Sequence, residues 1–549
     1  MKSFSNSKVL IVDDAPIVVV TIKSMLIKLG FNDRLIHYCS TSRIAMQMVR
    51  QDSFDLILCD YNLGRGLNGK QLFEEMKHHN LLHEKAVFVL ITGENSSSVV
   101  HSIVELKPDD YLLKPFNIVS LKERVTASIQ RKNALYQLYQ MQAKHQFAEG
   151  VELCDELLPF YPEYQFIISR FKGEFLSRLQ LHEESKALYE SILARKEYDW
   201  ATIGLANSLM HLGEKKTAEN MINKLLASKP NSTLLRTAAA NLSLINNAIP
   251  VAIRHFELAS KIVRGNSERE LVICNLCLAV GDYENALERY RIYMEINKET
   301  YRNTIFARIN FIRILLYACY KADEKTKAAR LSEAKTLYNQ VTSLKSAQSL
   351  KVELDLILAH IALVEEHYDL AVGKLNQVHR QFDLAHYYPM HQFAWLLNHM
   401  NFDTEFSHLI PKCSAIIQSK QSENIHASQI TMLNQLQQAN SEKLQWLEAK
   451  HKYIKANKMT LTELLKIYIE INSRCPFLQS VCISIIKLLA RRLPREADIE
   501  SLKKVVKQCD LVIRQLMDAD ELQKANYEDL YRSVINNYSM PQTEMSKSA

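Results

Sequence analysis

Glycine and proline are scarce in this chain. Its 549 residues include only 12 of each. Turn-rich β structure needs both residue types, so their scarcity argues against β structure over most of the length and favours long helices joined by short turns. A chain of this length is also too long for one hydrophobic core, and we expect two to four domains.

Long apolar runs and blocks of like charge are missing as well. No stretch approaches the ~18 apolar residues of a membrane span, and one of the longest runs, Ile312–Tyr320, contains Arg313. The segment Met1–Val12 has too short an apolar run for a signal peptide. The net charge of +7 comes from 68 basic and 61 acidic residues spread along the chain. We therefore expect a cytoplasmic protein with no membrane or nucleic-acid partner.

The ten cysteines do not form the pattern of a disulfide framework. Most of them lie inside apolar segments, which favours buried, reduced thiols. Cys274 and Cys277 have CxxC spacing, but no second cysteine or histidine pair follows at the distance of a zinc site. This spacing alone is a weak indication of a metal or redox site.

Short apolar segments alternate with helical patterns over the first 130 residues. The predicted strands are Lys8–Val12, Leu35–Cys39, Leu56–Asp60, Ala86–Thr92 and Asp110–Leu113. The predicted helices are Ile17–Leu29, Thr41–Arg50, Asn68–His79, Ser97–Glu105 and a helix starting at Asn117. Five consecutive βα units predict a parallel sheet covered by helices on both faces.

Polar side chains stand where these strands end. Asp13 and Asp14 end the first strand, Asp60 the third and Thr92 the fourth, while Lys114 follows the fifth. The carboxyl ends of parallel strands form one edge of the sheet, where ligands gather. Three clustered carboxylates repel one another unless a cation lies among them, and oxygen ligands suit Mg²⁺. The set suits phosphoryl transfer onto Asp60 by positioning and charge neutralisation.

Residues 6–130 resemble the receiver domain of two-component response regulators, since these positions occur in order on the predicted elements. The resemblance implies an α/β flavodoxin-like fold with strand order 2-1-3-4-5. It also implies a histidine kinase or phosphotransfer protein as the phosphoryl donor. A receiver is no enzyme beyond its own phosphoryl transfer and dephosphorylation.

The resemblance further assigns a role to each residue of the site. It implies that Asp60 is the phospho-acceptor, that Asp13, Asp14, Asp60 and the backbone carbonyl of Asn62 bind Mg²⁺, that Thr92 and Tyr111 are the switch residues, and that Lys114, before Pro115, pairs with the phosphoryl group.

The loop after Asp60 departs from the family pattern. Family members usually place a glycine eight residues after the acceptor, whereas Gly69 stands nine after it, which predicts a one-residue insertion. Gly64, Gly66 and Gly69 also spell GxGxxG. The dinucleotide-binding fingerprint belongs to a first βα unit and needs an acid about 20 residues later, whereas this loop follows a third strand. We interpret it as a flexible loop with a chance glycine pattern.

The segment between Pro115 and Gly150 contains neither glycine nor proline, and its apolar residues recur at helical spacing. A flexible Gly/Ser linker is therefore absent. We expect the last helix of the α/β domain to run on, or to turn tightly, into the next domain, so that the junction is stiff.

A sequence repeat follows this junction. A small residue, an apolar or aromatic residue four positions later and another apolar residue seven positions later recur from Gly150, Ala187, Ala218, Ala252, Ala286, Ala334 and Ala371. The intervals are 37, 31, 34, 34, 48 and 37 residues. The region resembles the tetratricopeptide (TPR) repeat family, whose period is about 34. The resemblance implies an all-α superhelix that binds a protein or peptide ligand, with an ordinary helical bundle as the alternative. The 48-residue interval predicts an inserted or missed helix.

Beyond this region the helical periodicity continues without a clear repeat. The predicted domains are a receiver at 1–130, TPR-like repeats at 131–385, a C-terminal helical region or diverged repeats at 386–537, and a disordered tail at 538–549. Arg491 and Arg492 could contact DNA, but basic residues in a last helical turn more often complement the helix dipole.

The whole layout resembles TPR-containing response regulators of the VieB type. This resemblance implies a bacterial two-component regulator in which phosphorylation of Asp60 controls protein binding by the repeats, including control of its own phosphorelay. A DNA-binding transcriptional regulator, a diverged output enzyme in the C-terminal region and a simple phosphate sink are the alternatives. The oligomeric state is not determined by the sequence, and a homodimer is one of the alternatives.

Overall fold

The computed structural model describes residues 4–94, 102–103, 105–417, 422–493 and 498–539. These fall into two compact units, one formed by residues 1–273 and 292–303 and the other by residues 274–291 and 304–549. Within the described residues no helix combines the length and the apolarity needed to cross a membrane. Part of the predicted helix Ser97–Glu105 and most of the predicted tail 538–549 lie outside these residues.

The N-terminal domain is a five-stranded parallel sheet with the predicted order β2-β1-β3-β4-β5. The strands are β1 (Val9–Val12), β2 (Ile36–Cys39), β3 (Leu56–Asp60), β4 (Val87–Thr92) and β5 (Asp110–Leu113). The helices are α1 (Pro16–Lys28), α2 (Ser42–Gln51), α3 (Gly69–His78) and α5 (Ile118–Ala143), with a short 3₁₀ helix η1 at Asp33–Leu35. Each strand boundary lies within one residue of its prediction.

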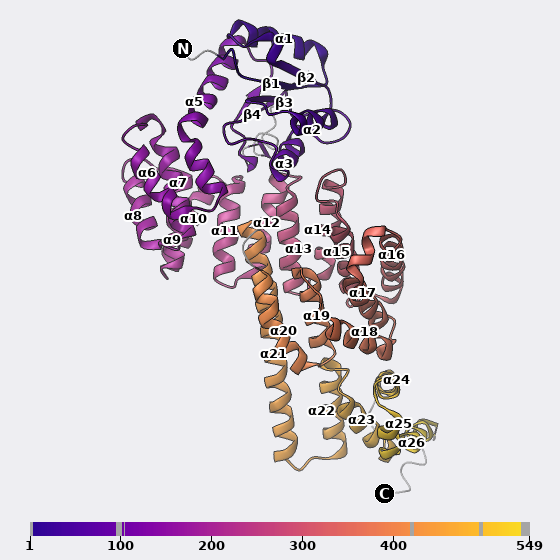
Figure 1. The fold of residues 1–549 in the computed structure, drawn as a ribbon. Coiled ribbons are helices and arrows are strands. Elements are labelled where there is room, and N and C mark those ends of the chain that lie inside the picture. Colours follow the sequence, from indigo (N-terminus) through magenta and orange to yellow (C-terminus); the bar gives the residue numbers. More distant parts are fainter. Residues whose placement is uncertain (1–3, 95–101, 104, 418–421, 494–497, 540–549) are drawn as a thin grey trace. The chain divides into compact units, whose positions relative to one another are not determined.

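Helices cover both faces of this sheet (Figure 1), because side chains alternate along each strand. Ile57 packs in a cluster with residues of α2 and α3. Its neighbour Leu58 packs in a second cluster with residues of α1 and with Leu121 of α5. The strands β1, β3 and β4 are buried along their whole length, so their near-continuous apolar character has a direct structural cause.

Helix α5 belongs to two hydrophobic cores at once. It runs through 26 residues without interruption, as the absence of glycine and proline predicts. Leu121 and Val125 pack in the core of the α/β domain, whereas Leu135 and Leu138 pack with residues of the following helices. One rigid element therefore joins the two parts.

The first unit continues as a series of helices. They are α6 (Phe147–Leu157), η2 (Pro162–Tyr164), α7 (Gln165–Arg178), α8 (His182–Leu193), α9 (Asp199–His211), α10 (Lys215–Ser228), α11 (Thr233–Ile245) and α12 (Ile249–Ile262). The division between the units passes through α13 (Ser267–Ala279) and α14 (Tyr283–Ile296).

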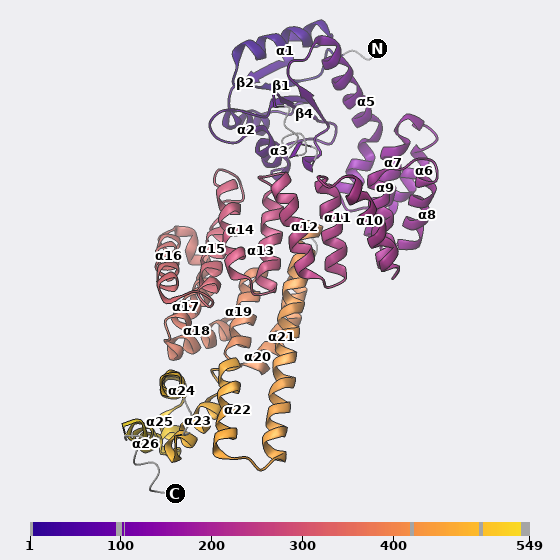
Figure 2. The same cartoon turned by 180° about the vertical axis from the view of Figure 1, so that it is seen from behind.

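The second unit is helical throughout its described residues. Its elements are α15 (Ile305–Ala318), α16 (Glu324–Thr342), η3 (Lys345–Leu350), α17 (Lys351–Val364), α18 (Tyr368–Gln381), α19 (Tyr387–His399), α20 (Asp403–Ile416), α21 (Glu423–Ala456), α22 (Leu461–Arg474), α23 (Gln479–Arg491), α24 (Ile499–Leu516), α25 (Ala519–Lys524) and α26 (Tyr527–Ser539). Helices α21 and α22 form a long hairpin (Figure 2). One hydrophobic cluster extends from Leu356 to Val534 across the predicted boundary at 385/386.

The predicted small residues lie on alternate helices, from α6 to α18. One of them was placed wrongly. Ala187 is exposed, whereas Ser185, the fourth residue of α8, is fully buried. The fourth residues of α6, α8, α10, α12 and α14 then follow one another at 35, 33, 34 and 34 residues, a more regular series than predicted. Ser185 also fits the predicted spacing, because Tyr189 and Ile192 stand four and seven positions later, whereas the residue four positions after Ala187 is Ser191.

The long interval before Ala334 contains no inserted helix, so this prediction is wrong. Only α15 lies between α14 and α16, and this stretch is fully described. Helix α16 has 19 residues, and Ala334 is its eleventh. A longer helix and a longer connection account for the extra residues.

Two glycines make room for one aromatic ring in the helices that follow α5. A methyl group added at Gly173 in α7 or at Gly204 in α9 would collide with Tyr189 of α8. Gly204→Ala should therefore lower the free energy of unfolding by about 1–3 kcal/mol, the usual cost of overpacking. Gly373→Ala in α18 is the matched control, since nothing lies within 4 Å of its added methyl group, and it should stabilise the helix by about 0.5–1 kcal/mol. Thermal unfolding of both variants measures the difference, and equal effects would contradict this packing.

Buried histidines should make the second unit sensitive to acid. Burial lowers the pKa of His360 to about 3 and the pKa of His391 to about 4. Both rings stay neutral in the folded state but take up protons in the unfolded chain below pH ~6.5, so stability should fall as the pH drops from about 6.5 to 4. His391→Gln removes one of these proton-binding groups. The slope of the free energy of unfolding against pH should therefore fall by about 1.4 kcal/mol per pH unit in this range. The exposed His408→Gln variant should leave the dependence measured by denaturant unfolding unchanged.

Candidate functional site

Three carboxylates meet at the carboxyl edge of the sheet. Asp13 and Asp14 follow β1, and Asp60 is the last residue of β3, which pairs directly with β1. Ligand oxygens of the three lie within 4.8 Å of one another. Asp13 and Asp60 are buried, whereas Asp14 is exposed. The sheet topology therefore brings together the acidic residues that the sequence predicted.

Lys114 lies between two of these carboxylates. Its Nζ is 2.8 Å from Asp13 Oδ2 and 2.8 Å from Asp60 Oδ1. The backbone of Lys114 donates a hydrogen bond to the carbonyl of Thr92, which continues the β4–β5 pairing and fixes its position. Asp13 Oδ1 in turn accepts a hydrogen bond of 2.9 Å from the backbone of Ala15. Charge-assisted bonds of this kind hold the site in one geometry.

The electrostatics of the site depend on partial burial. Burial raises the pKa of Asp60, while the hydrogen bond to Lys114 and the positive charge of Lys114 act in the opposite direction. Burial lowers the pKa of Lys114, but the two carboxylates outweigh it and the net pKa is raised. An uncompensated excess of negative charge stays at this edge, because one ammonium group faces three carboxylates.

The donor set fits Mg²⁺. Oxygen atoms from three aspartates close enough to share one ion, with one of them exposed to solvent, leave room for the waters that Mg²⁺ retains. A divalent ion would neutralise the excess negative charge around Asp60 and polarise a phosphoryl oxygen there.

The remaining predicted site residues border this edge. The Thr92 side chain is 1% exposed, and its Oγ1 accepts a hydrogen bond of 3.1 Å from the backbone of Glu94. Tyr111 on β5 is half-buried and packs against the hydrophobic cluster that contains Phe88. Asn62 donates a hydrogen bond of 2.9 Å from its side-chain amide to Glu94 Oε1.

The backbone conformation and the close contacts of the loop after Asp60 explain its three glycines. Gly64 and Gly66 adopt φ values of +68° and +96°, which favour glycine. A methyl group at Gly64 would lie 3.3 Å from Asp14 Oδ2, and one at Gly69 would collide with the backbone oxygen of Asp60. The GxGxxG spacing is thus no chance pattern, because the path of the loop around the carboxylates requires glycine at all three positions.

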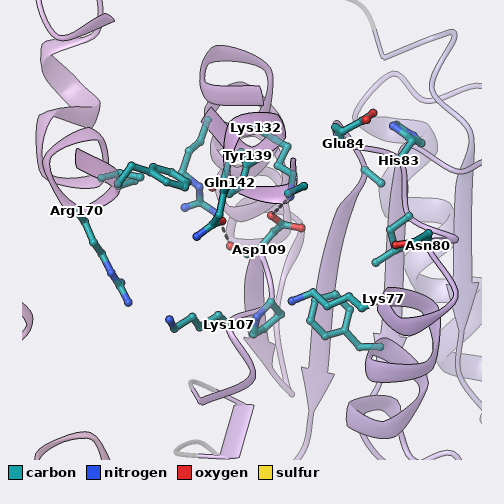
Figure 3. Close-up of a pocket in the computed structure, with 18 of the residues that line it drawn as sticks. Lys77, Asn80, His83, Glu84, Lys107, Asp109, Lys132, Tyr139, Gln142 and Arg170 are labelled. Carbon is teal, nitrogen blue, oxygen red and sulfur yellow. Dashed lines mark hydrogen bonds and ion pairs between the residues drawn. The ribbon is translucent and has the colours of Figure 1, made fainter. Parts of the chain in front are cut away.

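Sequence reasoning missed a polar junction between the sheet and α5. Asp109 accepts hydrogen bonds from Lys132 Nζ at 2.8 Å and from the backbone of Phe88 at 2.9 Å, and its carbonyl accepts one from Arg131. Figure 3 shows Lys132 beside Asp109 at a cavity of about 570 Å³. The only signal in the sequence was a pair of adjacent basic residues inside a helical pattern.

Comparisons with known proteins agree with this geometry. The family model described as the response regulator receiver domain matches residues 9–126. Residues 9–126 form a CheY-like receiver domain. Chemotaxis protein CheY-3 of Vibrio cholerae is 28% identical over 126 residues, which cover 23% of this chain and 94% of that protein. An all-helical region follows the receiver in this chain.

Two further similarities are of about the same extent, 23% of this chain each. Transcriptional regulatory protein YvrH of Bacillus subtilis is 30% identical over 126 residues, and the match spans 23% of this chain and half the length of YvrH. A solved CheY-like receiver domain from Methanospirillum hungatei is 24% identical with a TM-score of 0.21 and covers 23% of this chain and 96% of that structure.

Proposed function

We propose that this protein is a response regulator of a bacterial two-component system in which Asp60 accepts a phosphoryl group. The observation that carries the proposal is Lys114 Nζ at 2.8 Å from both Asp13 and Asp60 within a cluster of three carboxylates. An Oδ atom of Asp60 attacks phosphorus, the bond from phosphorus to the donor breaks, and an acyl phosphate forms. A histidine kinase or phosphotransfer protein is the donor.

Each residue of the site has a defined task in this transfer. Asp13, Asp14, Asp60 and the carbonyl of Asn62 would hold Mg²⁺, which supplies charge neutralisation at the phosphoryl oxygens. Lys114 can form an ion pair with the negatively charged phosphoryl group, because its Nζ already lies beside Asp60. Thr92 and Tyr111 lie on the neighbouring strands β4 and β5 and would change position once the phosphoryl group offers the Thr92 hydroxyl an acceptor.

The output of the protein is protein binding by TPR-like repeats. Support comes from the alternate helices α6 to α14, whose buried small fourth residues follow a period of 33 to 35 residues. Stacked helix pairs of this kind offer extended surfaces for peptides or helices. A component of the same phosphorelay is the partner that the VieB-type layout favours, so the regulator would modulate its own signalling system.

Incubation of the full chain with acetyl phosphate and Mg²⁺ tests the proposed function. Intact-mass spectrometry should show the addition of one phosphoryl group that hydroxylamine removes, as expected for an acyl phosphate, and chelation of the metal should prevent the addition. A chain that gains no mass, or one that carries a hydroxylamine-resistant phosphate, would overturn the proposal.

A further inference from the structure

Helix α3 of the receiver contacts two segments at helix ends in the same compact unit. They are residues 265–269, which run into α13, and residues 296–302, which begin at the end of α14, and they are here named the docking segments. Lys70 Nζ donates a hydrogen bond of 3.1 Å to the carbonyl of Gly265. Glu75 Oε1 accepts one of 2.5 Å from the backbone of Tyr301. Receiver side chains thus satisfy backbone groups that helix ends and loops otherwise leave to water.

Charged and aromatic pairs extend this contact. Arg302 Nη1 lies 3.0 Å from Glu74 Oε2, and the ring of His78 stacks on Tyr301 with a centroid distance of 3.7 Å. Glu105, which follows α3 and β4 in the receiver, accepts hydrogen bonds from Arg269 at 2.5 Å and from Asn266 at 3.0 Å. The two ion pairs, Arg302–Glu74 and Arg269–Glu105, therefore each join an acid of the receiver to a base of the docking segments.

Three charged side chains are buried at this contact. Lys70, Glu75 and Arg269 are only 8%, 7% and 6% exposed, and burial lowers the pKa of Lys70. Charged groups leave water only at a cost that their partners must offset. A contact held by such closely balanced contributions can be broken by a small local change.

Gln71 connects the docking segments to the phosphorylation loop. Its Nε2 donates a hydrogen bond of 3.0 Å to the carbonyl of Ile296, while its Oε1 accepts one of 3.1 Å from the backbone of Asn68. Asn68 is the N-cap of α3, and the next residue, Gly69, touches the backbone of Asp60 so closely that a side chain has no room. The path from the acceptor to the docking segments therefore spans only residues 68–71 of the receiver.

We propose that residues 265–269 and 296–302 are an intramolecular docking site for receiver helix α3, and that phosphorylation of Asp60 loosens this docking. The second part rests on the proposed function. A phosphoryl group adds strong acceptor oxygens and negative charge to Asp60, whose backbone touches Gly69 in the first turn of α3. A shift of residues 68–69 beside the modified Asp60 would break the hydrogen bond from the Asn68 N–H to Gln71, and a displaced Gln71 releases Ile296.

Hydrogen–deuterium exchange of the full chain tests the docking itself. Glu74→Arg and Arg302→Glu should each speed exchange in peptides covering the docking segments by roughly tenfold, because each replaces an ion pair by like charges. The double variant restores opposite charges and should recover protection. Gln71→Ala should also lower the protection of the docking segments. Gln47→Ala is the control, because Gln47 is an exposed glutamine on α2, and it should leave their protection unchanged. Unchanged exchange in both single charge variants, or no recovery in the double variant, would overturn the docking.

Beryllofluoride with Mg²⁺ then tests the coupling, with fluorine NMR reporting the adduct. Formation of the adduct should speed exchange in the docking segments of the wild type. In the Glu74→Arg variant, whose docking is already loosened, it should leave the exchange rate in these segments unchanged. An adduct without this change would overturn the coupling. Absence of the adduct would overturn the proposed function and the coupling with it, whereas lost protection in the charge variants would still support the docking.

Discussion

Replacing Asp13 by asparagine should slow the phosphorylation of Asp60 by about 100-fold or more. The Asp13 side chain is 2% exposed, and its Oδ2 lies 2.8 Å from Lys114 Nζ. The substitution removes one anionic ligand of the proposed Mg²⁺ and one of the two carboxylates that position Lys114, and losses of metal-site partners have effects of this size. The rate of mass increase with acetyl phosphate measures it, at several Mg²⁺ concentrations.

The matched control is Asp33→Asn. The side chain of Asp33 is 61% exposed and pairs with Lys23, so its loss should leave the rate unchanged. Saturating Mg²⁺ should rescue Asp13→Asn in part if the carboxylate acts as a metal ligand. A variant that reacts at the wild-type rate would contradict the assignment of Asp13.

A flexible Gly-Ser segment inserted after Asn133 should abolish communication through α5. The insertion leaves Leu121, Val125 and the contacts of Lys132 with Asp109 in place, but separates them from Leu135 and Leu138 in the core of the following helices. Phosphorylation should then no longer change hydrogen exchange in α6 and α7, while the mass gain at the receiver persists. Flexible insertions break mechanical continuity without removing contacts.

The same segment inserted between Asn457 and Lys458, an exposed connection after α21, serves as the control and should leave the response of α6 and α7 intact. Any remaining response in residues 265–269 and 296–302 would then come through α3, so the experiment separates the two routes. An unchanged response of α6 and α7 after the first insertion would show that a stiff α5 is not needed.

The strand ends and helix α5 could be predicted from the sequence because local patterns determine them. The run from Leu56 to Asp60 is buried along its whole length and ends at a carboxylate, and a parallel sheet must bring such ends to one edge. The uninterrupted helix α5 follows from the absence of glycine and proline. The ten cysteines, predicted to be buried thiols, are all buried and form no disulfide.

Features that depend on tertiary context were missed. Gly64, Gly66 and Gly69 looked like a chance pattern, because only the path of the loop shows what a side chain would meet. The contact of α3 with the docking segments joins residues about 195 to 228 positions apart, and no local pattern encodes such a pairing.

Hydride reduction of the phosphorylated chain tests the central claim most directly. Borohydride converts an aspartyl phosphate to homoserine, and peptide mapping after treatment with acetyl phosphate and Mg²⁺ should locate that homoserine at position 60 and nowhere else. Asp60→Asn protein should give none. Homoserine at Asp13, Asp14 or Asp55, or an equal yield from the Asp60→Asn protein, would contradict the assignment of Asp60 as the phospho-acceptor.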